Sequence, residues 1–243
     1  MGLKLEDKIM DKKIYNDRIS YCKDKIFKKV NNLWDLAEYH CEDNKIIMQC
    51  IYYVVWNSFK DNIYSLPELY SIDDVTDGKY GGETINTYST YFGSDDEKLK
   101  LYEFNDNEKQ IIKTFREKYL TIGNFMLLPK EKNNQSLNQI KCHYGDYADL
   151  FYYDLFETGK LNEIKQKNNF YFDKINAKEF CTKNFLEPYF YIQNNTYFIN
   201  KNIFMRDSLC EKKDFLVNYA KKSCEIINYR AYKICCILNE RFN

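Results

Sequence analysis

The chain has 243 residues, with 36 Lys and Arg balanced by 36 Asp and Glu, and 17% of its residues are aromatic. This balance excludes the one-signed field of a dedicated duplex-binding or membrane-surface protein, so any nucleic-acid contact is restricted to a local patch. Nine cysteines without a Cys-x-x-Cys pair, no signal-like N-terminus and no apolar run near the ~18 residues of a membrane span predict a cytoplasmic protein with reduced thiols and no membrane contact.

The first 60 residues predict helices. Residues 5–30 carry apolar side chains among many charges, at a spacing that suits one or two amphipathic helices. Residues 33–39 begin a short helix that is expected to bury Trp34. From 43 to 59, apolar residues recur at i, i+3, i+4, i+7 and i+8, which predicts the central buried helix, with Asp43 as its N-cap.

A loop and two further helices are predicted next. Residues 73–82 are acidic and rich in glycine, which is typical of an exposed loop. Residues 83–92 place apolar side chains at helical spacing, and residues 99–119 contain a second such helix, with Asp106 or Asn107 as its cap. Both helices precede the apolar stretch at the middle of the chain.

That central stretch, residues 119–129, combines apolar residues with turn chemistry. Gly123 and Asn124 stand between two short apolar runs and tolerate positive φ, so they predict a tight reversal or the abrupt start of a strand. We expect a short strand pair or extended core segment here. It should be buried against the helices at 43–59 and 215–242, because these three segments hold the longest apolar surfaces.

The second half of the chain returns to helices with one hairpin. Residues 147–156 and 161–172 predict two helices, the first of them aromatic. Asn194-Asn195 lies between two aromatic runs and predicts a short hairpin. Residues 215–242 repeat apolar positions at helical spacing, which predicts a long closing helix.

The expected fold class is mainly α. No internal repeat, Pro-, Gly- or Ser-rich linker or shift in composition divides the chain. Residues 1–243 are therefore expected to form a single helical domain with a short central β-hairpin or strand pair.

Three short motifs resemble the C-terminal part of the HNH nuclease domains of the GmrSD type. Those domains carry a Gly-Asn-x-x-Leu-Leu strand, a downstream Asn and a terminal helix with Ile-x-x-Arg. The matching segments here cover a minor part of the chain and are Thr121 to Leu128, Leu137-Asn138 and Ile226 to Ile234. In that family an Asp-His-Ile-x-Pro segment just before the strand supplies the metal site and the general base. Here residues 114–119 stand at that place and contain no histidine.

The resemblance suggests four candidate catalytic residues, which are Glu83, Asn124, Asn138 and Arg230. Asn124 would orient a phosphate or a catalytic water, and Arg230 would neutralise developing negative charge. Asn124 and Arg230 each have a structural alternative. Turn chemistry alone explains Asn124, and Arg230 beside the apolar stripe of the last helix is expected to form an ion pair that holds that helix to the core.

A second polar group is a candidate ligand-binding pocket, made of Glu83, Thr84, Asn86, Thr87 and Thr90. The glycines and the lysine in residues 77–84 are the ingredients of a phosphate cradle. They do not match the P-loop in order or spacing, and an acidic residue stands where an anion would bind. A flexible loop is the favoured interpretation.

The sequence contains two histidines, His40 and His143, in different segments. His143 with Asp146 and Asp149 has a spacing that would suit a mononuclear metal site, but a loop histidine before an N-capping Asp explains the same residues. No complete metal, phosphate or catalytic motif is present, so no metal and no cofactor are expected.

We therefore expect a non-enzymatic macromolecule-binding protein, such as an inhibitor or accessory factor in conflict between bacteria and phages. Its partner is expected to be a protein or a ribonucleoprotein. The alternatives are a degenerate HNH-type nuclease or nucleotide-acting enzyme, and a helical sensor that binds a nucleotide at residues 83–90. Convergence of Asn124, Asn138 and Arg230 with Glu83 in one cleft would favour the enzyme, and separate packing roles would favour the binding protein.

Overall fold

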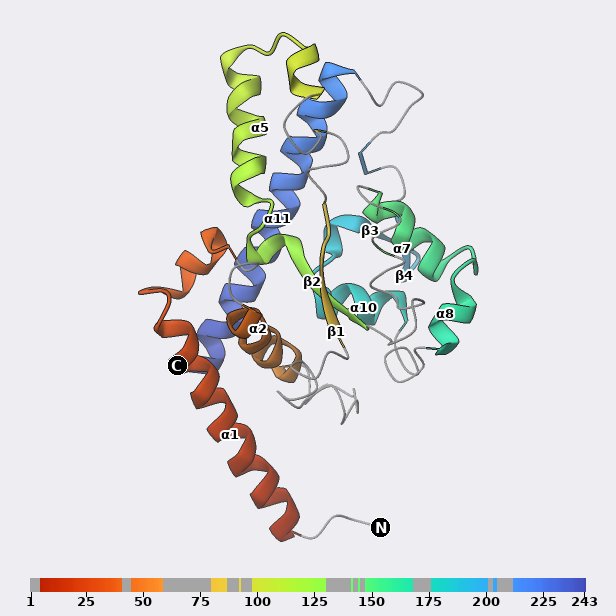
Figure 1. Ribbon diagram of the computed structural model, residues 1–243. Coiled ribbons are helices and arrows are strands. Elements are labelled where there is room, and N and C mark those ends of the chain that lie inside the picture. The colour runs from red at the N-terminus through yellow and green to blue at the C-terminus, as the bar shows by residue number, and fades with distance from the viewer. Residues whose placement is uncertain are drawn as a thin grey trace.

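The computed structural model describes residues 5–40, 45–58, 80–86, 92, 98–129, 141, 144, 147–167, 176–200, 203–204 and 212–243. Within these residues helices predominate, and the strands form two short antiparallel pairs (Figure 1). The mainly α fold class with a short strand pair is thereby confirmed. No helix of the described part of the chain has the length and apolar character that crossing a membrane requires.

Helices come before, between and after the two strand pairs along the chain. The α-helices are α1 (Leu5–Phe27), α2 (Lys45–Ser58), α5 (Asp106–Lys118), α7 (Ala148–Phe156), α8 (Asn162–Lys167), α10 (Ala177–Asn184) and α11 (Lys213–Phe242). The 3-10 helices are η1 (Leu33–Glu38), η4 (Lys98–Leu101), η5 (Ile122–Asn124) and η6 (Glu187–Tyr189). The strands are β1 (Tyr80–Thr84), β2 (Phe125–Pro129), β3 (Phe190–Gln193) and β4 (Thr196–Ile199).

Helix α11 packs against more of the other described elements than any other helix or strand does. It contacts α5, η5, η1, α2 and α1, and in Figure 1 it runs from the top of the view down to the C-terminus beside α1. Its buried side chains recur at helical spacing along all 30 residues and include Leu216, Ala220, Ile227, Ile234 and Leu238. The predicted long closing helix is therefore confirmed, and one continuous apolar face explains how it serves several partners.

The predicted core lies where the apolar pattern placed it. Helix α2 is buried along most of its length, and Ile51 has no exposed surface. In β2 the side chain of Leu127 is 2% exposed. Strand β1 pairs antiparallel with β2, from Tyr80 opposite Pro129 to Thr84 opposite Phe125.

Strand β1 corrects part of the predictions of a loop at 73–82 and a helix at 83–92. Residues 80–84 are extended, so the helix does not begin at Glu83, whereas residues 73–79 and 87–91 lie outside the described part of the chain. The physical reason is that β2 presents unpaired backbone groups in the core, and a second strand satisfies them whatever helical spacing the sequence carries. Gly82 suits this place because a Cβ there would lie 2.9 Å from Cε of Met48.

Gly123 is required for a different reason from the one predicted. Positive φ occurs at Gly159, Phe185, Asn194 and Asn195 among the described residues, and not at Gly123 or Asn124. Residues 122–124 form η5, from which β2 starts abruptly, as one of the two expected alternatives had it. A Cβ on Gly123 would stand 2.1 Å from the carbonyl oxygen of Ile227. The glycine therefore permits close approach of η5 to α11.

The predicted hairpin at Asn194-Asn195 is confirmed. These two residues connect β3 to β4 with φ values of 50° and 60°. Positive φ at both central residues is the requirement of a type I′ turn, whose twist matches that of the flanking strands. Asparagine adopts this conformation more readily than other non-glycine residues.

The N-cap of α5 lies one residue before the positions predicted for it. The side chain of Asn105 accepts a hydrogen bond from the backbone N–H of Glu108, and the Glu108 carboxylate accepts one from the N–H of Asn105. This capping box satisfies two N–H groups that a helix start leaves unpaired. The apolar spacing predicted the helix but not its first residue.

Trp34 is not buried as predicted but keeps 44% of its surface exposed. Only one narrow face of the short helix η1 is buried, and Leu33 and Leu36 occupy it. The Trp34 ring instead stacks on Tyr232 of α11, with ring centroids 5.6 Å apart.

The described cysteines are free thiols.

Gly123→Ala is expected to lower the free energy of unfolding by about 1–3 kcal/mol, because the added methyl group meets the backbone of α11 and no side-chain rotation relieves the clash. Gly82→Ala is the matched control, since its methyl group meets only the flexible end of Met48. Urea denaturation followed by circular dichroism measures both. Equal midpoints for the two variants would contradict the close approach of η5 and α11.

Candidate functional site

Arg230, a predicted catalytic residue, is fully buried and bound to the chain's own backbone. Its Nε donates a hydrogen bond to the carbonyl oxygen of Asn184 at 2.9 Å. Its Nη1 donates to the carbonyl oxygen of Phe125 at 2.8 Å and to that of Gly123. Its Nη2 lies 3.5 Å from the hydroxyl of Tyr52. One guanidinium on α11 thus holds η5, β2 and the end of α10 together.

These partners correct the expectation of an ion pair. Within the described residues, Arg230 binds carbonyl oxygens and a hydroxyl in place of a carboxylate. Asn184 is the last residue of α10, where carbonyls lack intrahelical partners and carry the negative end of the helix dipole. A buried guanidinium therefore finds its countercharge in backbone dipoles, and five fixed N–H groups suit several acceptors at once.

Asn124 lies beside this cluster, and its side-chain amide is also occupied. Its Nδ2 donates to the carbonyl oxygens of Asn86 at 2.7 Å and Tyr119 at 2.8 Å. Its Oδ1 accepts from the backbone N–H of Asn86 at 2.9 Å. Both amide hydrogens are used, so the side chain ties the residues after β1 to the end of α5. This is a structural role, and it leaves no amide hydrogen for a phosphate or a water.

The predicted ligand-binding residues that are described serve the core as well. Asn86 is fully buried, and its Oδ1 accepts a hydrogen bond from the Tyr189 hydroxyl at 2.7 Å. Burial raises the pKa of the Tyr189 phenol well above its usual range, so the hydroxyl remains a donor. The carbonyl oxygen of Thr84 accepts from Nζ of Lys141 at 3.1 Å.

The remaining predicted residues are placed only in part. Glu83 lies in β1, opposite Met126 of β2. His40 lies against the end of α5, with Nε2 3.1 Å from the carbonyl oxygen of Glu117. Outside the described residues lie Thr87, Thr90, Asn138, His143 and Asp146. In the described part of the chain, no three His, Cys, Asp or Glu side chains gather as ligands of a metal ion.

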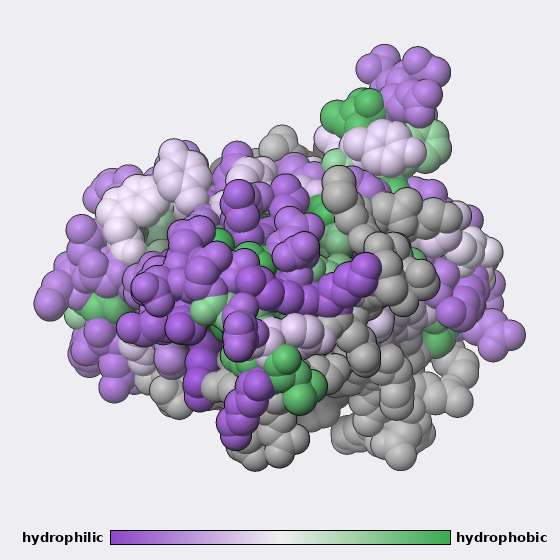
Figure 2. Space-filling view, turned by 90° about the horizontal axis from the view of Figure 1, so that it is seen from above, coloured by the Kyte–Doolittle hydropathy of each residue, from purple (hydrophilic) through white to green (hydrophobic). Residues whose placement is uncertain are grey.

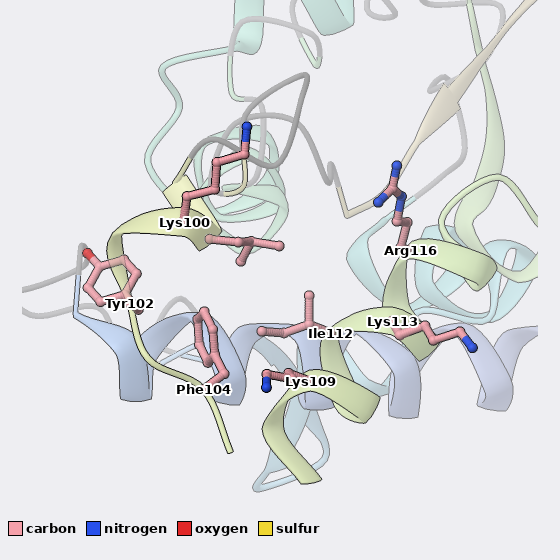
Figure 3. Close-up of a pocket in the computed structure, with 8 residues that line it drawn as sticks. Lys100, Tyr102, Phe104, Lys109, Ile112, Lys113 and Arg116 are labelled. Carbon is pink, nitrogen blue, oxygen red and sulfur yellow. The ribbon is translucent and has the colours of Figure 1, made fainter. Parts of the chain in front are cut away.

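The sequence analysis missed a pocket between η4 and α5, shown in Figure 3. We call it the α5 pocket, and it has a volume of about 350 Å³. The residues that line it are Leu99, Lys100, Tyr102, Phe104, Lys109, Ile112, Lys113 and Arg116. The last four stand at i, i+3, i+4 and i+7 on α5, and thus on one face of the helix. The spacing of the cations Lys109, Lys113 and Arg116 is visible in the sequence and could have indicated a basic helix face.

The α5 pocket has an apolar floor and a basic rim. Ile112 is buried, and Tyr102 and Phe104 are half-buried. Lys100, Lys109, Lys113 and Arg116 are exposed, and none of the eight described lining residues is acidic. Lys109 pairs with Asp106 at 3.7 Å and Lys113 pairs with Glu117 at 3.8 Å, in both cases between exposed side chains. Such pairs contribute little, so the two lysines keep their attraction for an anion.

The aromatic part of the α5 pocket is fixed from behind by α11. The rings of Tyr102 and Phe104 meet edge to face with centroids 6.0 Å apart. Nζ of Lys213 lies 5.9 Å from the Phe104 centroid and forms an ion pair of 2.7 Å with Glu108. The hydrogen bond from Lys213 lowers the pKa of the Glu108 carboxyl, which favours its ionised form. The rings therefore form a supported apolar platform with cations around it.

Figure 2 views the molecule from above, toward the end at which α5 begins in Figure 1. Hydrophilic side chains predominate on this face, and only small apolar patches lie between them. An extended apolar interface is therefore not a feature of this view. A contact of mixed character, with charge around a small apolar centre, suits the surface better.

A further buried charge lies in α10 next to the Arg230 cluster. Lys183 is 8% exposed, and burial lowers the pKa of its ammonium to about 8, an effect that nearby Glu179 opposes. Removing a charged group from water disfavours its ionised form. The uncharged form of the Lys183 side chain is therefore populated to a substantial extent near pH 8.

Comparison with protein-family models, with curated proteins and with solved structures finds no match to this chain. Its function is accordingly inferred from two groups of residues, the buried Arg230 cluster and the exposed α5 pocket.

Arg230→Lys is expected to lower the free energy of unfolding by about 3 kcal/mol, because one ammonium cannot reach carbonyls on three elements and leaves buried acceptors unpaired. Arg241→Lys is the control, since Arg241 is only half-buried and donates to the single carbonyl of Ser58 at 2.9 Å. Guanidinium denaturation compares the two. If Arg230→Lys unfolds at the wild-type midpoint, the structural role is wrong.

Lys183→Met is expected to have a free energy of unfolding higher than that of the wild type by as much as about 3 kcal/mol at pH 7. This difference between the two proteins is expected to shrink as pH rises. The pKa of Lys183 in the folded chain, about 8, lies below its ordinary value of 10.5. Between these values the unfolded wild type binds more protons, so this group makes wild-type stability rise with pH. Urea midpoints of both proteins at pH 7 and pH 9.5 test the sign. If the difference in stability between Lys183→Met and the wild type is the same at both pH values, the lowered pKa of Lys183 is ruled out.

Proposed function

We propose that this chain is a non-enzymatic macromolecule-binding protein that contacts its partner through the α5 pocket. One observation carries the proposal, which is the set of four exposed cations around an apolar, partly aromatic floor. The charged residues that line the pocket are all basic, although the chain as a whole has no net charge. A partner that presents negative charge at the contact fits it, and nucleic acids and ribonucleoproteins are partners of this kind.

The interior supports a role without catalysis. Asn124 and Arg230 are the two catalytic candidates whose side chains are described. Both donate hydrogen bonds to backbone carbonyl oxygens of the chain itself. A catalytic arginine or asparagine needs donors that face the reacting atoms. The binding residues, by contrast, are exposed and lie on a regular helix, which is where a preformed contact surface is expected.

A degenerate HNH-type enzyme is the second candidate, because the two motif segments that the structure describes, Thr121 to Leu128 and Ile226 to Ile234, meet in space. Arg230 binds the carbonyl oxygens on both sides of Asn124, and Gly123 packs against Ile227 of the same helical motif. Residues 114–119, which stand where the family carries its Asp-His-Ile-x-Pro segment, contain no histidine. A nucleotide-binding sensor at 83–90 has less support, since Asn86 is buried.

The binding proposal is tested by affinity for a polyanion. Wild-type protein is expected to be retained on immobilised heparin, and a Lys109→Glu, Lys113→Glu double variant to elute at clearly lower salt, because like charges then face the polyanion. The control is Lys28→Glu with Lys29→Glu, the same change of charge at exposed positions directly after α1, which are not among the residues that line the pocket. Identical elution of the two double variants would refute the α5 pocket as the contact surface.

The enzymatic alternative is tested on the same preparation. Labelled DNA, RNA and nucleotides are incubated with the protein and Mg²⁺ or Mn²⁺, and no hydrolysis is expected. Metal-dependent hydrolysis that Arg230→Lys abolishes, in a variant shown to be folded, would instead establish the enzyme.

A further inference from the structure

We infer that the α5 pocket binds single-stranded nucleic acid, with a base against the Tyr102 and Phe104 rings and phosphates on the basic rim. This inference rests on the proposed function and names the ligand of the same site. It combines two chemistries that occur together in the pocket. Cations alone would suit any polyanion, whereas cations around exposed ring surface suit an anion that also carries aromatic faces.

The phosphate contacts follow from the geometry of α5. Lys109, Lys113 and Arg116 span seven residue steps along one helix face, which is about 10 Å at 1.5 Å per residue. That is enough for more than one phosphate of a single strand. Lys100 stands on the η4 side of the pocket, and Figure 3 shows its ammonium and the charged ends of Lys113 and Arg116 pointing outward, away from Phe104 and Ile112. The cations thus lie at the outer edge of the apolar floor.

The base contact follows from the rings. Tyr102 and Phe104 are only half-buried although they are large apolar groups, and they pack edge to face at 6.0 Å. Stacking of a base on an aromatic side chain is strong and tolerates any base, because every base has a π face. The volume of about 350 Å³ is at the small end of ligand pockets and suits one nucleotide rather than several.

Single strands are favoured over duplexes and over acidic peptides by these same features. A duplex keeps its bases stacked inside, so it would use the cations and leave the rings without a partner. An acidic peptide would do the same. Four cations are also few for a duplex contact, which gains most of its affinity from many phosphate contacts. Only a strand with accessible bases uses the whole pocket.

The test uses fluorescence anisotropy with a labelled oligothymidylate of about 12 nucleotides, within the usual site size for single strands. An abasic strand of equal length carries the same phosphates without bases. We expect the oligothymidylate to bind at least about fivefold more tightly than the abasic strand, because stacking of one base contributes that much. A 12-base-pair duplex and a polyglutamate peptide are expected to bind more weakly than the oligothymidylate.

Two variants separate the contributions. Phe104→Leu keeps an apolar floor but removes the ring face, so it is expected to abolish the preference for bases while leaving affinity for the abasic strand unchanged. Lys113→Gln is expected to weaken both strands and to reduce the slope of log affinity against log salt by about 0.7. Lys28→Gln is the control for charge. Melting curves confirm that each variant is folded.

The outcomes distinguish this inference from the proposed function. Equal binding of the oligothymidylate and the abasic strand, or tighter binding of the duplex or of polyglutamate, would overturn the single-strand assignment while heparin retention through the pocket still supported a binding protein. Loss of the base preference in Lys28→Gln would also overturn it. If the two charge-reversed double variants elute from heparin at the same salt, both the proposed function and the single-strand inference are overturned.

Discussion

The structure depends on one buried guanidinium. Arg230 is inaccessible to water, and its N–H groups meet carbonyl oxygens of Gly123, Phe125 and Asn184. A charge in the interior persists only if it is well bonded, because desolvation is costly. The positions of η5, β2 and the end of α10 are therefore tied to α11. The glycine at 123 follows from the same constraint, since α11 must come close enough for the guanidinium to reach.

This cluster connects the core to the surface that carries the proposed function. Below it, β2 pairs with β1 and packs near α2, where Tyr52 donates to the same Phe125 carbonyl. Above it, α11 continues along α5, and the contact includes the rings of Phe115 and Tyr219 with centroids 5.8 Å apart. The pocket is therefore built on a helix that is itself held against the central one. Binding groups on such rigid elements need little ordering when a ligand arrives.

The polar residues of the chain divide between two tasks. Asn124, Asn86 and Arg230 are buried and bonded to backbone or to one another, so changes there act first on stability. Lys109 and Lys113 are exposed, with weak ion pairs, and under the proposed function changes there act on binding. The motifs that resemble HNH domains belong to the first task. Gly-Asn before a strand and Ile-x-x-Arg on a helix describe how two segments pack, whatever chemistry accompanies them.

The sequence by itself determined the elements with strong periodicity and local chemistry. The repeated apolar positions of α2 and α11 and the two asparagines of the β3–β4 turn specify their structure within a few residues, because spacing and backbone preference act locally. Only the tertiary structure decided the rest. The extended residues of β1 follow from pairing with β2, the carbonyl partners of Arg230 come from three distant segments, and the α5 pocket forms only when residues after η4 fold against α5. Such contacts depend on which surfaces meet, and no pattern within one segment records that.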